Sequence, residues 1–392
     1  MIVVGLTSGA SVSGIDVIVC EIRGGPPTLR TEVLSSLTIP WPLELRKMVL
    51  QAWQPNQAVN MEDLCLLDVA VGEAFAAAAL EGIAYGGLYP EQVDLVGLQG
   101  QTVWHQVRED GHVMASLQLG QAAIVAEWTG ITTISNFQQR DIAAGGQGAP
   151  LMGYVDWLLL RHPQHCRAVQ LLDSISSVTF LPPLSMPQAQ PVAFDTGPGT
   201  ALIDYAESRL DRLTERSLNR RGEGTGYDPT LLSELMADPY LQRQPPKTVG
   251  NLMYDETFAA ELWDEACQAG LSPTVILETF IAFTVFSIAD AYKRFASIPI
   301  DEVILGGKGR HYPHLMRRFR EVMAPLPVHT LEDVGMDSET KASLAIAVLA
   351  YETWHNRPCT LPSLTGAHQA IPLGSIIPGQ NYQQLLRITW ST

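Results

Sequence analysis

The sequence predicts an α/β protein of two domains. Its 392 residues exceed what one ordinary hydrophobic core contains, so two domains of ordinary size are expected. Short apolar stretches rich in β-branched residues alternate with longer stretches of helical period. A strand, a turn of small polar residues and a second strand occur twice, at residues 2–22 and 168–181. This recurrence suggests two related domains that face a cleft.

In the first half, the apolar period predicts strands at 2–6, 17–22, 93–98, 116–119 and 132–135, and helices at 43–53, 61–83, 120–127 and 151–160. The turn at 7–14 presents hydroxyls and backbone N–H groups and can hold phosphate, although ordinary hairpins also use Gly and Ser. Gln101 and Thr102 follow the strand at 93–98, which is a suitable position for a ligand.

In the second half, strands are predicted at 168–172, 178–181, 191–194 and 303–305, and helices at 231–236, 258–268, 273–295, 314–323 and 343–351. A charged, glycine-rich stretch at 209–228 is expected to be an exposed loop. The glycine turn at 306–310 can admit a nucleotide base or phosphate but is too short for a Walker loop. The tail at 363–379 is expected to pack as loop and strand.

Asp195 is the candidate general base. It follows an extended run at 191–194 and precedes a helix whose apolar period begins at Leu202. Open α/β sheets bind their ligands beyond the carboxyl ends of the strands, which is where this carboxylate is expected. The alternative is that Asp195 caps the following helix.

The glycine-rich stretch at 136–150 is the most unusual part of the chain. Three glycines around Gln147 would destabilise a regular element, so they suggest a backbone that passes close to a ligand or to another segment. A tight crossing between domains is the alternative.

Composition restricts the partners. The formal charge of −16, from 41 acidic and 25 basic residues, disfavours nucleic acid and anionic membranes. A bound nucleotide therefore needs backbone N–H groups, helix N-termini or Mg²⁺. The five cysteines are far apart without metal-ligand spacing, so we expect reduced thiols and no metal site of their own. We expect no leader and no apolar stretch of the ~20 residues that a membrane span needs, hence a cytoplasmic protein.

Several motifs stand in one order along the chain. They are Gly-Gln-Thr-Val-Trp-His at 100–105, Leu-Gln-Leu-Gly at 117–120, Asp-Ile-Ala-Ala-Gly-Gly-Gln-Gly-Ala-Pro-Leu at 141–151, Asp-Thr-Gly-Pro-Gly at 195–199, Pro-Pro-Lys-Thr at 245–248 and Leu-Pro-Ser-Leu-Thr-Gly-Ala at 361–367. Together, over residues 5–378, they resemble the 1,6-anhydro-N-acetylmuramic acid kinases and the related levoglucosan kinases. The resemblance implies a two-domain, actin-like and hexokinase-like sugar kinase fold with ATP in the interdomain cleft. It also implies domains at 1–133 with 372–392 and at 134–371, and a homodimer.

The resemblance further implies a reaction used in cell-wall sugar recycling. Water opens the anhydro ring at C1 while the freed 6-oxygen attacks the γ-phosphate of ATP, with Mg²⁺ required. Asp195 matches the base that activates the water. The positions matching the nucleotide site are Gly9, Ala10, Ser11, Ser13, Gly14, Asp173, Ser174, Gly197, Gly199, Gly306, Gly307, Lys308 and Gly309. The positions matching the sugar site are Gln101, Thr102, Asn136, Gln138, Gln147 and Gly148.

The chain departs from the family at its phosphate turns. Ala10 lacks the usual hydroxyl, and Ser13 replaces the carboxylate that helps to organise Mg²⁺. Asp173 and Ser174 replace two glycines of the second turn, so a negative charge is expected near the triphosphate. Like charges ~4 Å apart repel by about 4 kcal/mol at an effective dielectric constant near 20. Lys308 replaces the middle glycine of the adenosine turn, where it can block the base or offset Asp173.

The sugar-site motifs depart from the family as well. Asn136 and Gln138 stand where the family has Asp and Arg, and Gln99 stands where it has His. Asn251 and Leu252 replace Arg and Glu. These losses predict an anhydrosugar kinase with impaired activity. The alternative is a non-catalytic pseudokinase that keeps the fold and binds a ligand or a protein.

Overall fold

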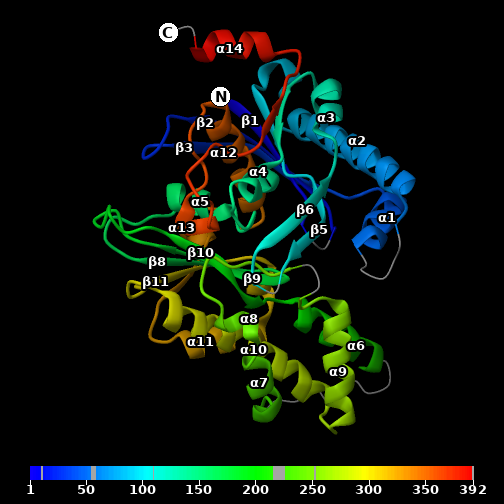
Figure 1. The fold of residues 1–392 in the computed structure, drawn as a ribbon, viewed down its shortest axis with the longest axis vertical. Coiled ribbons are helices and arrows are strands. Elements are labelled where there is room, and N and C mark those ends of the chain that lie inside the picture. Colours follow the sequence, from blue (N-terminus) through cyan, green and yellow to red (C-terminus); the bar gives the residue numbers. More distant parts are fainter. Residues whose placement is uncertain (10–11, 54–58, 109, 215–225, 251–252, 391–392) are drawn as a thin grey trace. The chain divides into compact units, whose positions relative to one another are not determined.

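The structure, a computed structural model, describes residues 1–9, 12–53, 59–108, 110–214, 226–250 and 253–390 (Figure 1). Two compact units make up the chain: Met1–Leu160 with Glu339–Thr392, and Arg161–Ser338. These boundaries differ from those expected at 133/134 and 371/372. The first unit also contains residues 134–160 and 339–371. Within it, α5 (Met152–Leu159) lies against α12 (Lys341–Trp354).

The first unit is built on a six-stranded sheet of order β13-β7-β4-β1-β2-β3. Its strands are β1 (Ile2–Thr7), β2 (Ile15–Arg23), β3 (Arg30–Ile39), β4 (Leu95–Leu98), β7 (Thr132–Ser135) and β13 (Ser375–Ile377). β1, β2 and β3 form an antiparallel meander, and β4 and β7 run parallel to β1. A separate hairpin pairs β5 (Gln101–Val107) with β6 (Val113–Leu119).

The second unit repeats the strand order of the first. Its five-stranded sheet, of order β10-β9-β8-β11-β12, consists of β8 (Arg167–Leu172), β9 (Ile175–Leu181), β10 (Val192–Pro198), β11 (Glu302–Gly306) and β12 (Val328–Thr330). β8, β9 and β10 form the meander, while β11 and β12 run parallel to β8. The two recurring strand–turn–strand units are therefore the first hairpins of two related sheets. In each sheet, the carboxyl ends of the parallel strands share one edge.

Helix α12 forms the centre of the first unit, and nearly all of its residues are buried. It packs on β1, β2 and β4. Small residues permit this close approach: a Cβ on Gly5 of β1 would lie 2.0 Å from the Ser343 carbonyl oxygen, and one on Gly97 of β4 would lie 2.7 Å from the Ile346 carbonyl oxygen. The other helices of this unit are α1 (Leu43–Trp53), α2 (Met61–Tyr85), η1 (Pro90–Gln92), α3 (Ala122–Thr129), α4 (Phe137–Ala143), α13 (Pro362–Thr365) and α14 (Tyr382–Trp390).

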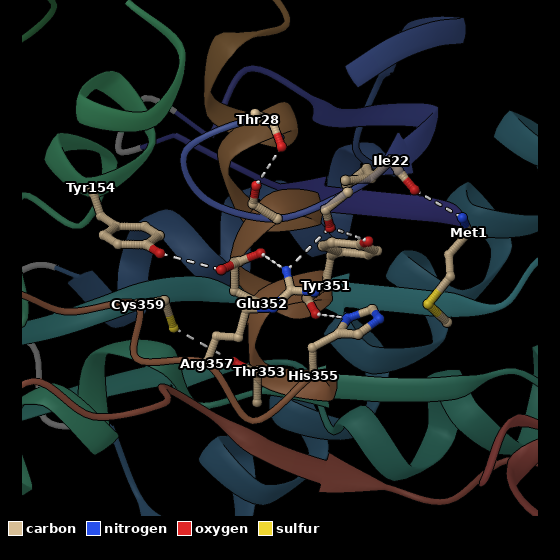
Figure 2. Close-up of polar contacts among 12 residues, drawn as sticks. Met1, Ile22, Thr28, Tyr154, Tyr351, Glu352, Thr353, His355, Arg357 and Cys359 are labelled. Atoms are coloured by element: carbon tan, nitrogen blue, oxygen red, sulfur yellow. Dashed lines mark hydrogen bonds and ion pairs between the residues drawn. The ribbon is translucent and has the colours of Figure 1, made fainter. Parts of the chain in front are cut away.

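Hydrogen bonds to a buried carboxylate connect the end of α12 to neighbouring segments (Figure 2). Glu352 is fully buried and accepts hydrogen bonds from the Tyr154 hydroxyl, at 3.3 Å, and the Arg357 guanidinium, at 2.7 Å. The Tyr351 hydroxyl and the same guanidinium both donate to the Gly24 carbonyl oxygen. Burial raises the pKa of Glu352, and removing one partner from such a buried group is destabilising. The cluster thus holds α5, α12 and the β2–β3 turn together.

The core of the second unit surrounds α10 (Pro273–Phe295), which is long and apolar enough to span a membrane. The expectation that no stretch reaches this length is therefore wrong. However, 67% of its most apolar window is buried inside the protein, as in the core helix of a globular domain. The other helices here are α6 (Ala201–Thr214), α7 (Pro229–Met236), α8 (Pro239–Gln242), α9 (Glu256–Gln268), η2 (Lys308–His311), α11 (Pro313–Met323) and η3 (Glu332–Val334). The predicted loop at 209–228 begins as part of α6, and residues 215–225 lie outside the described residues.

Candidate functional site

Asp195 lies inside strand β10, where the pairing with β9 shifts register between Asp195 and Gly197. Helix α6 begins only at Ala201. The carboxylate accepts its hydrogen bonds from the Thr248 hydroxyl, at 2.9 Å, and from the Val249 N–H, at 2.8 Å. The alternative that Asp195 caps the following helix is therefore wrong, because both donors come from another segment.

The surroundings of Asp195 suit a general base. The residue is 9% exposed, and burial raises its pKa to about 6 against the opposing effects of Val249, Thr248 and the Lys247 charge. About nine-tenths of the carboxyl groups are then ionised at pH 7. Both hydrogen bonds reach Oδ2, and no donor among the described residues reaches Oδ1. One oxygen is thus anchored while the other can accept a proton.

Three turns of the predicted nucleotide site meet at one edge of the second sheet. The Gly199 N–H donates to the Ser174 carbonyl oxygen at 2.9 Å, and the Thr200 N–H donates to the Asp173 carbonyl oxygen at 2.8 Å. The Lys308 N–H donates to Oδ1 of Asp173 at 3.1 Å. The structure therefore brings together the candidates Asp173, Ser174, Gly197, Gly199, Gly306, Gly307, Lys308 and Gly309.

The glycines of these turns are required by the packing of one turn on another. A Cβ on Gly199 would lie 1.9 Å from the Asp173 carbonyl oxygen. Gly307 has a φ of +85°, and its Cβ would lie 2.7 Å from the backbone of Leu172. The side chains of Asp173 and Lys308 are exposed beside these buried contacts. A nucleotide at this edge would meet backbone N–H groups, one carboxylate and one ammonium group.

The first phosphate turn lies in the other unit, and its Ala10 and Ser11 are outside the described residues. Side chains hold the remainder of the turn. The Ser8 hydroxyl donates to the Gly14 carbonyl oxygen at 2.9 Å and accepts from the Trp41 indole N–H at 3.1 Å. The Val12 N–H donates to the Gly9 carbonyl oxygen at 3.0 Å. Gly9 and Ser13 are exposed, while Gly14 is buried.

Gln101 and Thr102 follow β4, as predicted, and they begin strand β5. The Gln118 side-chain amide donates to the Thr102 hydroxyl at 3.2 Å, and Gln139 of α4 donates to Oε1 of Gln118. Side-chain amides therefore connect β5, β6 and α4. Gln101 is fully buried, and its amide donates to the Thr102 carbonyl oxygen at 3.1 Å.

The glycine-rich stretch is organised by Asp141, a residue to which the sequence assigned no role. Asp141 is fully buried and accepts hydrogen bonds from the hydroxyls of Thr360, at 2.8 Å, and Thr365, at 2.7 Å. Its other oxygen accepts from the Gly148 N–H at 2.8 Å. A Cβ on Gly146 would lie 2.1 Å from that oxygen. The stretch thus packs closely on another segment of the same unit; its contact with a ligand stays a prediction.

Three buried amide oxygens among the sugar-site candidates lack a hydrogen-bond donor from the described residues: Oε1 of Gln101, Gln138 and Gln147. Buried polar atoms are nearly always satisfied, so hydroxyl groups of a ligand or water are suitable partners. Gln138 and Gly148 are neighbours, since a Cβ on Gly148 would lie 3.4 Å from the Gln138 carbonyl oxygen. Asn136 is exposed at the start of α4, with a φ of +63°.

The described residues offer little for Mg²⁺. No group of three or more His, Cys, Asp or Glu side chains within them is placed to hold a metal ion. Mg²⁺ in phosphoryl-transfer sites usually takes one or two carboxylates together with the substrate phosphates. Among the described nucleotide-site candidates only Asp173 is a carboxylate, and it is already hydrogen-bonded to the Lys308 N–H. The side chains do not fit a well-formed Mg²⁺ site.

Comparison with known proteins agrees with the motifs. The family model described as anhydro-N-acetylmuramic acid kinase matches residues 1–379. The anhydro-N-acetylmuramic acid kinase of Bacillus thuringiensis subsp. konkukian (strain 97-27) is 37% identical over 382 residues, 96% of this chain and 99% of that protein. That of Crocosphaera subtropica (strain ATCC 51142 / BH68) is 37% identical over 383 residues, 96% of this chain and 98% of that protein.

Among solved structures, the activator of the 2-hydroxyisocaproyl-CoA dehydratase from Clostridium difficile with bound ADPNP has a TM-score of 0.41 at 12% identity, over 90% of this chain and 95% of that chain. The predicted two-domain α/β architecture is confirmed by the two compact units and by their sheets, in which five strands follow the same order. On the family model and the curated relatives, the chain belongs to the anhydro-N-acetylmuramic acid kinase family.

Proposed function

We propose that the chain is an ATP-dependent kinase of 1,6-anhydro-N-acetylmuramic acid whose affinity for ATP is weakened. The observation that carries this proposal is Asp195, a buried carboxylate with one anchored oxygen and a pKa of about 6. These are the properties that a base needs to be ionised near neutral pH and still accept a proton.

In the proposed reaction, Asp195 takes a proton from a water molecule while the water oxygen bonds to C1 of the anhydrosugar. The bond between C1 and the bridging 6-oxygen breaks, and that oxygen bonds to the transferred phosphorus. ATP, when bound, supplies the phosphoryl group and leaves as ADP. The unpaired oxygens of Gln101, Gln138 and Gln147 are proposed to accept hydrogen bonds from sugar hydroxyls. The Asp141 contacts keep the glycine-rich stretch in place for this role.

Weakened nucleotide binding follows from Asp173. Its side chain is exposed, so water screens its charge more strongly than it would screen a buried charge. Like charges 4 Å apart in water repel by about 1 kcal/mol, which weakens binding about fivefold rather than abolishing it. The expectation of about 4 kcal/mol therefore overstates the effect. Mg²⁺ takes no part in these steps, since the described residues contain no group of three or more side chains placed to hold a metal ion.

A specific observation favours a second function, that of a non-catalytic ligand- or protein-binding member of the family. The Asp173 carboxylate already occupies the Lys308 N–H, a donor that would otherwise be available to a phosphate. If this contact persists, the phosphates lose one backbone donor, ATP binding is weakened further, and a binding role of the fold is favoured over turnover. A cytoplasmic location, a homodimer, and the lack of nucleic-acid and membrane partners remain predictions.

Two measurements separate the functions. Calorimetry with ATP and Mg²⁺ should show binding, and a ligand at 100 times its Kd should stabilise the fold by roughly 2.7 kcal/mol. ADP release should then depend on 1,6-anhydro-N-acetylmuramic acid, with levoglucosan as the comparison sugar. ATP binding without sugar-dependent ADP release would refute the kinase, and no binding at millimolar ATP would favour the second function.

A further inference from the structure

Lys247 is an unusual lysine because its ammonium group lies inside the second unit. The residue is 4% exposed. Its Nζ donates to the carbonyl oxygens of Tyr240 and Leu241, both at 3.1 Å. The same atom lies 4.7, 4.9 and 5.7 Å from the ring centroids of Tyr240, Phe295 and Phe194, respectively. Lysine is rarely buried, so this ammonium group is expected to have a role beyond packing.

Three hydrogen bonds connect Lys247, Tyr240 and Asp195, one between each pair of residues. The Lys247 ammonium donates to the Tyr240 carbonyl oxygen at 3.1 Å. The Tyr240 hydroxyl donates to the Asp195 carbonyl oxygen at 2.8 Å. The Asp195 N–H donates to the Lys247 carbonyl oxygen at 3.1 Å. The backbone of the proposed base is therefore held from both sides by residues of one short segment.

The next two residues of that segment hold the carboxylate itself. Thr248 and Val249 supply both hydrogen bonds to Oδ2 of Asp195. Since Lys247 precedes them directly, a displacement of Lys247 would move both donors. The lysine is thus placed to affect the orientation of the carboxylate as well as its ionisation.

Charge links the two residues independently of the hydrogen bonds. The Lys247 cation lowers the pKa of Asp195, and Asp195 raises the pKa of Lys247, which burial lowers to about 8. The other charged groups that act on Lys247 are Asp290, Arg294 and Arg243. Asp290 and Arg294 pair with each other at 2.7 Å. Tyr240 is the other titratable group that contacts Asp195, and burial raises its pKa well above the usual value.

We propose that Lys247 is a positioning residue for the reaction: its buried cation and its contacts with Tyr240 keep Asp195 ionised and correctly oriented. This inference rests on the proposed function of Asp195. Lys247 touches no reacting atom in it. It acts through the carboxylate, which loses a stabilising positive charge when the lysine is replaced.

The test is the pH profile of kcat/KM for sugar-dependent ADP release in Lys247→Met, which removes the charge and keeps an unbranched apolar side chain. The acid limb should move upward by about half to one pH unit, because one nearby charge is lost. At pH 6, kcat/KM of Lys247→Met should be about two- to fivefold lower than that of the unchanged protein, and the difference should shrink toward pH 8. Lys293→Met, which removes an exposed lysine of the same unit, is the control and should leave the limb in place. An unmoved limb in Lys247→Met would overturn the inference.

A second readout does not depend on turnover. The stability gained by Asp195→Asn over Asp195 levels off as the pH passes the folded pKa, so the pH at which the gain levels off reports the titration of the carboxylate in the folded protein. This pH should be higher in the Lys247→Met background by the same half to one unit. If the shift occurs without sugar-dependent ADP release, Lys247 controls Asp195 and only the proposed kinase function fails. If the pH at which the stability gain levels off is the same in both backgrounds, the inference fails whether or not the protein is a kinase.

Discussion

Replacing Asp195 by Asn should remove one pH-dependent contribution to the free energy of unfolding. The folded pKa of Asp195 is about 6, whereas an unfolded aspartate titrates near pH 4. The folded state therefore holds its proton more tightly, and stability is lost as the pH rises from about 4 through 6. Two pKa units correspond to about 3 kcal/mol, of which about 2 kcal/mol falls between pH 4 and pH 7.

The unchanged protein alone does not reveal this effect, because His105 acts in the opposite direction. Burial lowers the pKa of His105 to about 4, so this residue loses stability as the pH falls. The difference in unfolding free energy between Asp195→Asn and the unchanged protein cancels the His105 contribution. Urea titrations at several pH values should show this difference rising by about 2 kcal/mol from pH 4 to pH 7 in favour of Asn. Asp264→Asn, at an exposed position, is the matched control for loss of a carboxylate. A difference that stays constant across this range would refute the raised pKa of Asp195.

Three further predictions concern other residues. Asp173→Asn keeps an acceptor for the Lys308 N–H and removes the charge, so ATP affinity measured by calorimetry should rise about fivefold. The control Asp264→Asn should leave ATP affinity unchanged; the same result for Asp173→Asn would show that phosphates do not bind near Asp173. Asp141→Asn leaves at least one buried donor unpaired and should lower the unfolding free energy by about 2–4 kcal/mol in urea titrations, and a loss below 0.5 kcal/mol would contradict its central role. His105→Gln should remove about 3 kcal/mol of acid-induced destabilisation between roughly pH 6.5 and pH 4, and unchanged acid sensitivity would contradict the burial of a neutral imidazole.

Elements with a strong apolar period could be predicted from the sequence almost to the residue. The helices at 43–53 and 273–295 have the predicted bounds. Strand β3 was missed, because this largely exposed strand mixes polar and apolar residues without a regular period and lacks a continuous apolar run. Residues 101–107 received no strand prediction, because the stretch begins with polar residues; they form β5 because β6 supplies their hydrogen-bond partners.

The site was predictable at the level of residues that follow strands, but its internal contacts were not. Asp195 was identified from its position, while Thr248 and Val249, which hold it, come from 53 and 54 residues further along the chain. The contacts of Asp141 span 219 and 224 residues. Such distances can be read only once the fold is known. The motifs at 141–151, 245–248 and 361–367 contain or adjoin these residues, and this was the available signal.

The most direct test of the account is ADP release by the unchanged protein and by Asp195→Asn, at saturating ATP with and without 1,6-anhydro-N-acetylmuramic acid. General base catalysis contributes roughly 10²- to 10⁴-fold to a rate. We expect sugar-dependent ADP release that falls by at least about 100-fold in Asp195→Asn, with ATP affinity unchanged. Turnover by Asp195→Asn within tenfold of the unchanged protein, or bound ATP without any sugar-dependent release, would contradict it.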